Sequence, residues 1–232
     1  KDDLDRDGDI PVAVVIGPSV SSDPGYANLS QSLNFLNLDN DRFTFILSST
    51  TTGFIGAAGG VQEADNLCNA EVLNKPSLFN AGQAGYRALI VDGPIRRAAV
   101  SPNAIVGGTS EQRDWVLQPF TAYFRWINAS ADYTFASGAN NIFRTDANGL
   151  FDFSSFSLFN STSIAANYYW TGLNADWTTA IARCGPPGAE WKDGTVIQNG
   201  SIGDASQTDG RSISTIVPST CAVPRALLCV EQ

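Results

Sequence analysis

Four cysteines constrain the fold of this chain more than any other feature of its sequence. They are Cys68, Cys184, Cys221 and Cys229, and no two of them have C-x-x-C spacing. The chain contains no histidine, so these cysteines have no imidazole partner for a typical zinc site. An even set of this kind predicts disulfides and an oxidising compartment. Four cysteines allow three pairings, and the spacing does not choose among them.

The absence of histidine also narrows the chemistry open to this protein. Ser-His-Asp triads, Cys-His dyads and HExxH zinc sites all need an imidazole, and all are excluded. Carboxylate chemistry remains available, yet none of the 23 Asp and Glu residues stands out as half of an acid–base pair. We therefore expect that the protein is not an enzyme.

Composition and charge indicate an extracellular protein. The 232 residues are 43% hydrophobic, enough for one large core, and only 16% charged. The net charge of -9 disfavours nucleic acid and anionic lipid as partners. No apolar run reaches the 18 residues of a membrane-spanning helix. Because the chain has no Met, even at position 1, we expect a removed signal peptide, the alternative being an arbitrary boundary.

Hydrophobic periodicity predicts an α+β chain with two short helices and several short strands. One helix is expected at residues 61–73, and a second begins at Thr109 and contains Trp115, Val116 and Leu117. The expected strands cover residues 42–47, 86–92, 122–127, 149–153, 168–173 and 225–230. Long polar loops separate the later strands.

The first 40 residues form an acidic linker followed by an apolar strand, and the main domain covers residues 41–232. The strand is expected at residues 10–17, a β-branched run between two prolines. Such a strand cannot stay in water with its backbone groups unpaired. It either folds back onto its own domain, with residues 18–40 as the return, or adds to the sheet edge of a neighbouring subunit.

Alternating carboxylates in the acidic linker resemble the first half of a calcium-binding loop. Asp3, Asp5, Asp7 and Asp9 are spaced like calcium ligands, and Gly8 would permit the sharp turn. The twelfth position of such a loop is Val14 rather than Glu, so further ligands would come from elsewhere. Calcium is the one cofactor we expect, and the alternative is a solvated acidic segment.

Several sequence phrases, spread in order over residues 42–232, resemble a known family. They are Glu63-Ala64-Asp65-Asn66-Leu67-Cys68, Tyr86-Arg87-Ala88-Leu89, Trp170-Thr171-Gly172-Leu173, Cys184 with Trp191, and Leu227-Leu228-Cys229-Val230-Glu231 after Cys221. They resemble the endostatin-like branch of C-type-lectin-like domains, and more closely an uncharacterised domain family of bacterial surface lipoproteins, notably of spirochaetes. The resemblance implies a C-type-lectin-like fold with two short helices, a twisted antiparallel sheet and long loops.

The same resemblance implies specific roles for individual residues. It pairs the cysteines in a nested order, Cys68–Cys229 and Cys184–Cys221. It places Trp170 in the core and Gly172 where a strand needs close backbone approach. The chain departs from sugar-binding members because it lacks their EPN or QPD and WND calcium triplets. Calcium-dependent sugar binding of that kind is not expected, and zinc binding through histidine is impossible.

The long-loop region, residues 173–221, is where we expect ligand binding. Its candidate residues are Asp176, Trp177, Trp191, Asp193 and Arg211. Exposed aromatic side chains among polar loops suit sugar stacking or protein contact, unless both tryptophans pack onto the core. We expect a secreted or surface-displayed adhesion module that recognises an extracellular protein or glycan. The alternative is a structural subunit that assembles into an oligomer or filament through its N-terminal strand.

Overall fold

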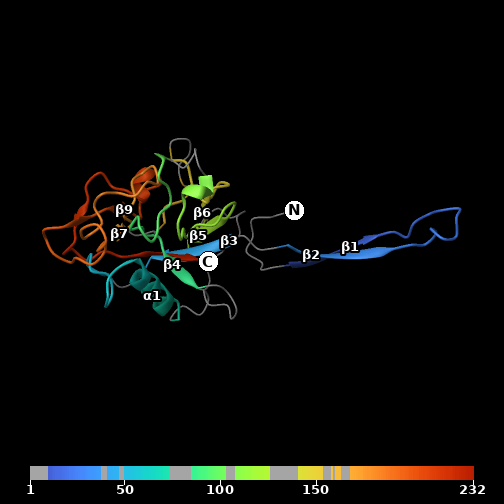
Figure 1. Ribbon diagram of the computed structural model, residues 1–232, viewed down its shortest axis with the longest axis horizontal. Coiled ribbons are helices and arrows are strands. Elements are labelled where there is room, and N and C mark those ends of the chain that lie inside the picture. The colour runs from blue at the N-terminus through green and yellow to red at the C-terminus, as the bar shows by residue number, and fades with distance from the viewer. Residues whose placement is uncertain are drawn as a thin grey trace.

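A β-hairpin projects from the body of the protein along its longest axis (Figure 1). The structure is a computed structural model, and it describes residues 10–37, 41–46, 50–73, 85–102, 108–125, 141–153, 158, 160–162 and 168–232. The hairpin consists of β1 (Ile10–Ile16) and β2 (Gln31–Asn37), which pair antiparallel in continuous register.

The hairpin confirms a strand at residues 10–17 and gives it a partner that the sequence analysis missed. β1 pairs with β2, which lies in the segment expected to be only a connection. The alternation of β2 is imperfect, because Leu36 shares a face with Ser32 and Asn34, and polar residues end the face that carries Leu33 and Phe35. The backbone groups along one edge of β1 therefore pair with β2 rather than with the main sheet.

The body is built around a five-stranded sheet whose strand order is β4-β11-β3-β5-β6. These strands are β4 (Tyr86–Ala88), β11 (Leu228–Glu231), β3 (Asp41–Ile46), β5 (Ala122–Arg125) and β6 (Asn141–Arg144). Neighbours run antiparallel except β3 and β5, which are parallel. This corrects the expectation of a wholly antiparallel sheet. A parallel pair needs a long crossover connection, and the helix α1 and strand β4 lie within it.

The helix α1 (Val61–Val72) packs against β4 and buries one stripe of its surface. Its buried residues, at helical spacing, are Val61, Ala64, Asp65, Cys68 and Val72. The Cys68–Cys229 disulfide ties this helix to β11. The second disulfide, Cys184–Cys221, closes the long-loop region. Both pairs match the nested order implied by the resemblance, so this prediction is confirmed.

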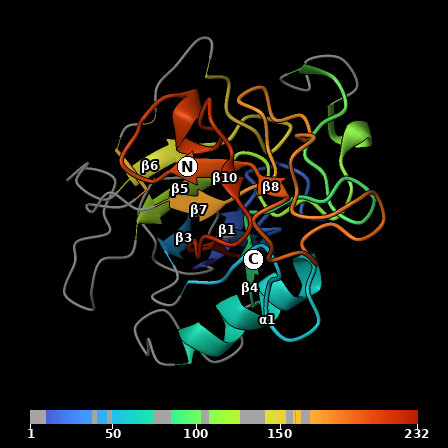
Figure 2. The same cartoon turned by 90° about the vertical axis from the view of Figure 1, so that its left-hand side faces the viewer.

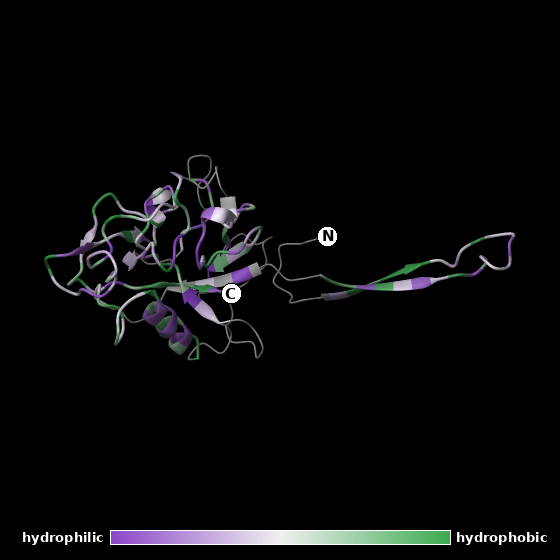
Figure 3. Ribbon diagram, in the orientation of Figure 1, coloured by the Kyte–Doolittle hydropathy of each residue, from purple (hydrophilic) through white to green (hydrophobic). Residues whose placement is uncertain are grey.

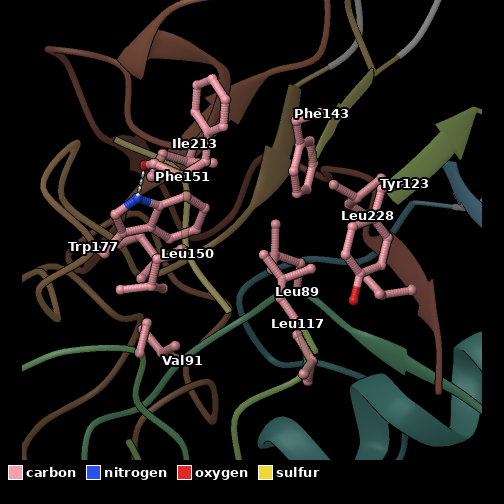
Figure 4. Packing of buried hydrophobic residues seen from close by; sticks show 14 of the residues in the cluster. Leu89, Val91, Leu117, Tyr123, Phe143, Leu150, Phe151, Trp177, Ile213 and Leu228 are labelled. Atoms are coloured by element: carbon pink, nitrogen blue, oxygen red, sulfur yellow. Dashed lines mark hydrogen bonds between the residues drawn. The ribbon is translucent and has the colours of Figure 1, made fainter. Parts of the chain in front are cut away.

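Both faces of the sheet are buried, because alternate side chains enter different clusters. Tyr123 and Leu228 belong to the cluster drawn in Figure 4, whereas Phe124 and Cys229 belong to the cluster on the side of α1. Trp170 is fully buried and its indole N–H donates to the Thr51 carbonyl at 2.9 Å, which confirms its core role.

Short strands and 3-10 turns complete the body. These are β7 (Tyr168–Trp170) paired with β9 (Ile202–Asp204), β8 (Asn199–Gly200) paired with β10 (Ser219–Thr220), and the turns η2 (Gly108–Glu111) and η4 (Gly210–Ser212). Gly172, just after β7, has φ +68°, and a Cβ there would lie 2.4 Å from the Val91 carbonyl oxygen. The predicted close backbone approach is confirmed.

Two predicted elements are wrong. The expected helix at Thr109 is only the turn η2, because the Glu111 carboxylate binds the backbone N–H groups of Val100 and Ser101 and the chain then forms a β-bridge. Residues 149–153 form a bend, an irregular segment and a turn in place of the expected strand. The aromatic residues of this segment gave it a strand-like pattern, because they pack into the core without forming a strand. Phe151, for example, is only 7% exposed. The described chain is thus α+β with one α-helix.

A buried ion cluster joins α1, β4 and the segment that follows. Arg96 is 1% exposed and donates to both oxygens of Asp65, at 2.9 and 2.6 Å. Arg87 also contacts Asp65, and both arginines contact Asp114. Burial alone would lower the pKa of Arg96, but the hydrogen bond and charge of Asp65 outweigh it and raise that pKa. Arg96 stays charged, and its contacts fix the helix to the segment that follows β4.

Candidate ligand-binding groove

An open groove of about 440 Å³ lies between β7, β9, η4 and the loop leading to β10. β7 and β9 lie at the end of the body away from the hairpin in Figure 1, the side that faces the viewer in Figure 2. The lining residues are Tyr168, Ile202, Asp204, Gln207, Arg211, Thr215, Ile216, Val217, Pro218, Ser219 and Arg225. The groove therefore combines an aromatic ring, aliphatic side chains, both signs of charge and hydrogen-bonding groups.

Tyr168 and Arg225 form a rigid aromatic platform at one wall. Tyr168 opens β7 and is 43% exposed, while the next residue of the strand is buried. The Arg225 guanidinium lies 5.1 Å from the centre of the Tyr168 ring and donates to the Ser219 hydroxyl at 3.0 and 3.1 Å. A β-bridge to Thr51 fixes the backbone of Arg225. The ring is thus held by a cation–π contact and stays accessible.

Arg211 and Asp209 form an exposed ion pair beside this platform. Asp209 caps η4 by accepting from the Arg211 backbone N–H at 2.9 Å, and its carboxylate also binds the guanidinium. The hydrogen bond from Arg211 holds the pKa of Asp209 below its usual range. The same contact raises the pKa of Arg211. Both groups therefore keep their charges at neutral pH.

Polar residues of β9 and the following turn form the opposite wall. Asp204 accepts hydrogen bonds from the backbone and hydroxyl of Ser206, at 3.0 and 2.7 Å, and from Gln207 at 3.2 Å. The backbone N–H of Thr215 donates to Ile202 at 2.7 Å. Ile216 and Val217 project into solvent at the rim, 92% and 72% exposed. A ligand in the groove would contact the hydrogen-bonded polar groups around Asp204 and the exposed aliphatic side chains of Ile216 and Val217.

Comparison with known proteins gives a family but no activity. The model of the family described as Protein of unknown function (DUF1554) matches residues 51–208. This span is more than half of the chain. The chain belongs to the DUF1554 family. No curated protein matches it.

The DUF1554 match covers the groove only in part. It includes α1, β4 to β9 and the groove residues Tyr168, Ile202, Asp204 and Gln207. It ends before Arg211, the rim and Arg225. The hairpin also lies outside the DUF1554 segment.

The structure corrects the expectation that two tryptophans of the DUF1554 segment face a ligand. Trp177 is 2% exposed, and its indole N–H donates to the Phe151 carbonyl (Figure 4). Trp191 is fully buried, donates to the Val91 carbonyl at 2.8 Å and packs 5.7 Å from the Trp170 ring. Large apolar area outweighs the polar loop context here, so both pack onto the core, as in the alternative reading.

The two carboxylates predicted to bind ligand in the long-loop region accept hydrogen bonds from residues in their own turns. Asp176 accepts from the backbone N–H and hydroxyl of Thr178, at 3.1 and 2.6 Å. Asp193 accepts from the Thr195 N–H at 2.7 Å. Of the five predicted ligand-binding residues, Arg211 alone lines the groove. The predicted site is thus not a single cluster.

The predicted calcium ligands Asp3, Asp5, Asp7 and Asp9 lie outside the described residues. Within the described ranges no three His, Cys, Asp or Glu side chains are placed to hold a metal ion. Calcium at the acidic segment stays a prediction. In the same part of the chain, no helix combines the length and apolar character needed to cross a membrane.

Sequence reasoning missed most of the groove. Tyr168 carried a weak signal, because strand alternation places it opposite the buried Tyr169. Arg225 and Asp204 carried none, because their contacts depend on how segments distant in the sequence fold against β7. Ile216 and Val217 are exposed although they are aliphatic, and no local pattern distinguishes such residues from buried ones.

Proposed function

We propose that this chain is a non-enzymatic binding module that acts outside the cell and recognises an extracellular protein or glycan through the groove beside Tyr168. The observation that carries the proposal is the exposed Tyr168 ring held under the Arg225 guanidinium. An accessible aromatic ring next to charged and amide groups suits a sugar ring or a peptide side chain. The ring is oriented before any ligand arrives, which lowers the entropic cost of binding.

The charges of the groove support recognition rather than proton transfer. Arg211 lines the groove, and its contact with the neighbouring Asp209 lowers the pKa of Asp209 and raises that of Arg211, so both charged forms are favoured. General acid–base catalysis works best with a pKa near the operating pH, and these shifts move both groups away from neutrality. A ligand with hydroxyl, amide or charged groups would therefore exchange hydrogen bonds with a permanently ionised wall.

We also assign the fold to the C-type-lectin-like, endostatin-like class. The nested disulfides support this, since Cys68–Cys229 encloses Cys184–Cys221 and joins the first helix to the last strand. Two disulfides fit a protein that folds in an oxidising compartment. We propose secretion or surface display, as in bacterial surface lipoproteins.

A glycan and matrix-protein array tests the proposal. The chain should bind at least one ligand, and Tyr168→Ala should weaken that binding about tenfold or more, since one stacked aromatic residue contributes about 1–3 kcal/mol. Tyr26→Ala is the matched control, because Tyr26 is a 65% exposed tyrosine in the hairpin. Arrays with calcium and with a chelator measure any contribution of the acidic segment.

Three results would contradict the proposal. One is binding that Tyr168→Ala and Arg211→Ala leave intact while both variants keep the native near-ultraviolet spectrum. Another is turnover of any arrayed polysaccharide or protein, which would make the chain an enzyme. An array without any bound ligand would also count against an adhesion module.

A further inference from the structure

The β1–β2 hairpin exposes an apolar surface that the groove does not explain. Ten of the 22 exposed large apolar side chains in the described residues lie within residues 10–37. Figure 3 shows apolar segments along both strands. The register places Val12 opposite Phe35 and Val14 opposite Leu33, on one face. These four side chains are 36–55% exposed.

β2 offers an unprotected edge for further pairing. The hairpin has two strands, so each strand has one edge without a sheet partner within the described residues. Natural edge strands are protected by proline, charge or bulges. β1 carries Pro11, whereas β2 contains no proline, glycine or charged residue. A two-stranded hairpin is marginal in water, and three or more strands with an apolar face are stable.

The sequence of β2 is suited to antiparallel pairing with itself. Asn34 is the central residue of the strand, and Leu33 and Phe35 flank it on the apolar face. A two-fold axis at Asn34 would place Leu33 opposite Phe35 of the partner subunit. It would also place Asn34 opposite Asn34 of the partner subunit, amide against amide. Gln31 would face Asn37 of the partner subunit, so three of the four kinds of pair match in polarity, and only Ser32 would face an unlike residue, Leu36 of the partner subunit.

Charge favours a second copy of the chain in antiparallel orientation. Residues 10–37 carry a single charge, on Asp23, although the whole chain carries -9. The acidic residues 1–9 precede β1 at the base of the hairpin. In antiparallel pairing, the base of each hairpin lies beside the tip of the other hairpin. The two bases are then one strand length apart, about 23 Å, which exceeds the Debye length of about 8 Å. Parallel pairing would bring the bases together.

A lipid surface fits the hairpin less well. The hairpin has no Lys or Arg to attract anionic headgroups, and its strands have 7 residues each. A strand that spans a bilayer needs about 9–11 residues. The hairpin therefore matches a protein edge better than a membrane.

We propose that two copies of this chain associate through β2 and form a four-stranded antiparallel sheet, β1-β2-β2-β1, around a two-fold axis at Asn34. The bodies lie at opposite ends of this sheet, and both grooves stay open. The proposal is independent of the groove, because β7 and β9 lie at the other end of the body (Figure 1).

Charge exchange at Leu33 and Phe35 tests the register. L33K/F35K and L33E/F35E should each sediment as monomers at concentrations where the unsubstituted chain is a dimer. An equimolar mixture should form a 1:1 heterodimer, because each lysine then faces a glutamate. V12K/V14K is the matched control, with the same added charge on the same face of the outer strand. It should keep the dimer within about threefold of the unsubstituted dissociation constant.

Cross-linking gives a second measurement that does not depend on charge. Asn34→Cys should yield a disulfide-linked dimer under mild oxidation, because residues directly opposite have Cβ atoms about 4.5–5.5 Å apart. Ser32→Cys is the control. It lies on the same face but four residues from its own symmetry mate, about 13 Å away.

Three outcomes would overturn the proposal. They are a full chain that is monomeric at millimolar concentration, a charged mixture that fails to associate, and loss of the dimer in V12K/V14K. Unchanged thermal unfolding of the body in every variant separates these outcomes from misfolding. Ligand binding on the array is a separate readout of the groove.

Discussion

The strands of the hairpin and those of the body differ sharply in burial. From Val12 to Ile16, every residue of β1 is exposed, although the strand is seven residues long. β11 has only four residues, and all of them are buried between two side-chain clusters. Local pairing is enough to form a strand, whereas burial needs partners from distant parts of the chain. Strand formation and stability are therefore separate properties in this molecule.

The difference predicts where substitutions matter. The body holds both disulfides, the ion cluster around Asp65 and the two apolar clusters. The hairpin is stabilised by backbone pairing and a few hydrogen bonds in its turn, such as the one that the Gly25 N–H donates to the Asp23 carboxylate at 2.8 Å. Changes to these buried groups of the body should destabilise the fold, and changes in the hairpin should alter only what it contacts.

The largest loss should follow removal of the disulfide that joins the first helix to the last strand. Cys68→Ala/Cys229→Ala opens a link between residues 161 positions apart. A link across so long a segment restricts the unfolded chain, and its loss should cost about 4–5 kcal/mol. Urea unfolding of the double variant measures this. A midpoint equal to that of the native protein would show that the helix is held by packing alone.

Loss of the central carboxylate of the ion cluster should cost almost as much. Asp65→Ala leaves Arg96 buried and without its main partner, which should cost about 3–4 kcal/mol. Asp209→Ala is the control, because it removes an exposed pair with Arg211. Surface pairs of this kind contribute little, and loss of the η4 cap adds about 1 kcal/mol, so its thermal midpoint should fall much less than that of Asp65→Ala. Equal effects of both substitutions would refute a special role for burial.

A methyl group added at Gly200 should destabilise the body by about 2 kcal/mol through overpacking. A Cβ there would lie 2.6 Å from the Cys184 sulfur and 2.7 Å from the Trp170 ring, and neither can move freely. Gly25→Ala in the hairpin is the control, since its nearest neighbour would be the exposed Asp23 carboxylate at 3.3 Å. Thermal unfolding of both variants measures the effect, and only Gly200→Ala should lower the midpoint.

The same contrast explains how far the sequence predicted the structure. The helix at 61–73 followed from the spacing of Val61, Ala64 and Cys68, because one face of a helix repeats every three to four residues. The burial of Trp170 and the cysteine pairs followed from resemblance. The Asp65–Arg96 pair could not be predicted, since its partners lie 31 residues apart and meet only after α1 packs on β4. The groove depends on loops whose conformations no local pattern encodes, so Arg225 was missed.

Acid should weaken the body through Asp114. Burial would raise the pKa of this carboxyl, but the hydrogen bonds and charges of Arg87 and Arg96 outweigh it and lower the pKa. A lowered folded-state pKa stabilises the protein above the ordinary Asp pKa of about 4, and this contribution is lost as pH falls through the folded-state value. The stability difference between native protein and Asp114→Asn should therefore shrink below about pH 4. A constant difference down to pH 2 would contradict the assigned cause.

The smallest effect on the body should come from removing the hairpin altogether. Within the described residues, no hydrogen bond or ion pair joins residues 10–37 to the body. The projecting position in Figure 1 agrees with this independence. Deletion of residues 1–37 should therefore change the free energy of unfolding of the body by no more than about 0.5 kcal/mol, as for surface substitutions. The truncated chain keeps β3 and all four cysteines, so its near-ultraviolet spectrum should match that of the full chain. A loss of several kcal/mol would mean that the hairpin packs on the body in solution, and the contrast between the two regions would fail.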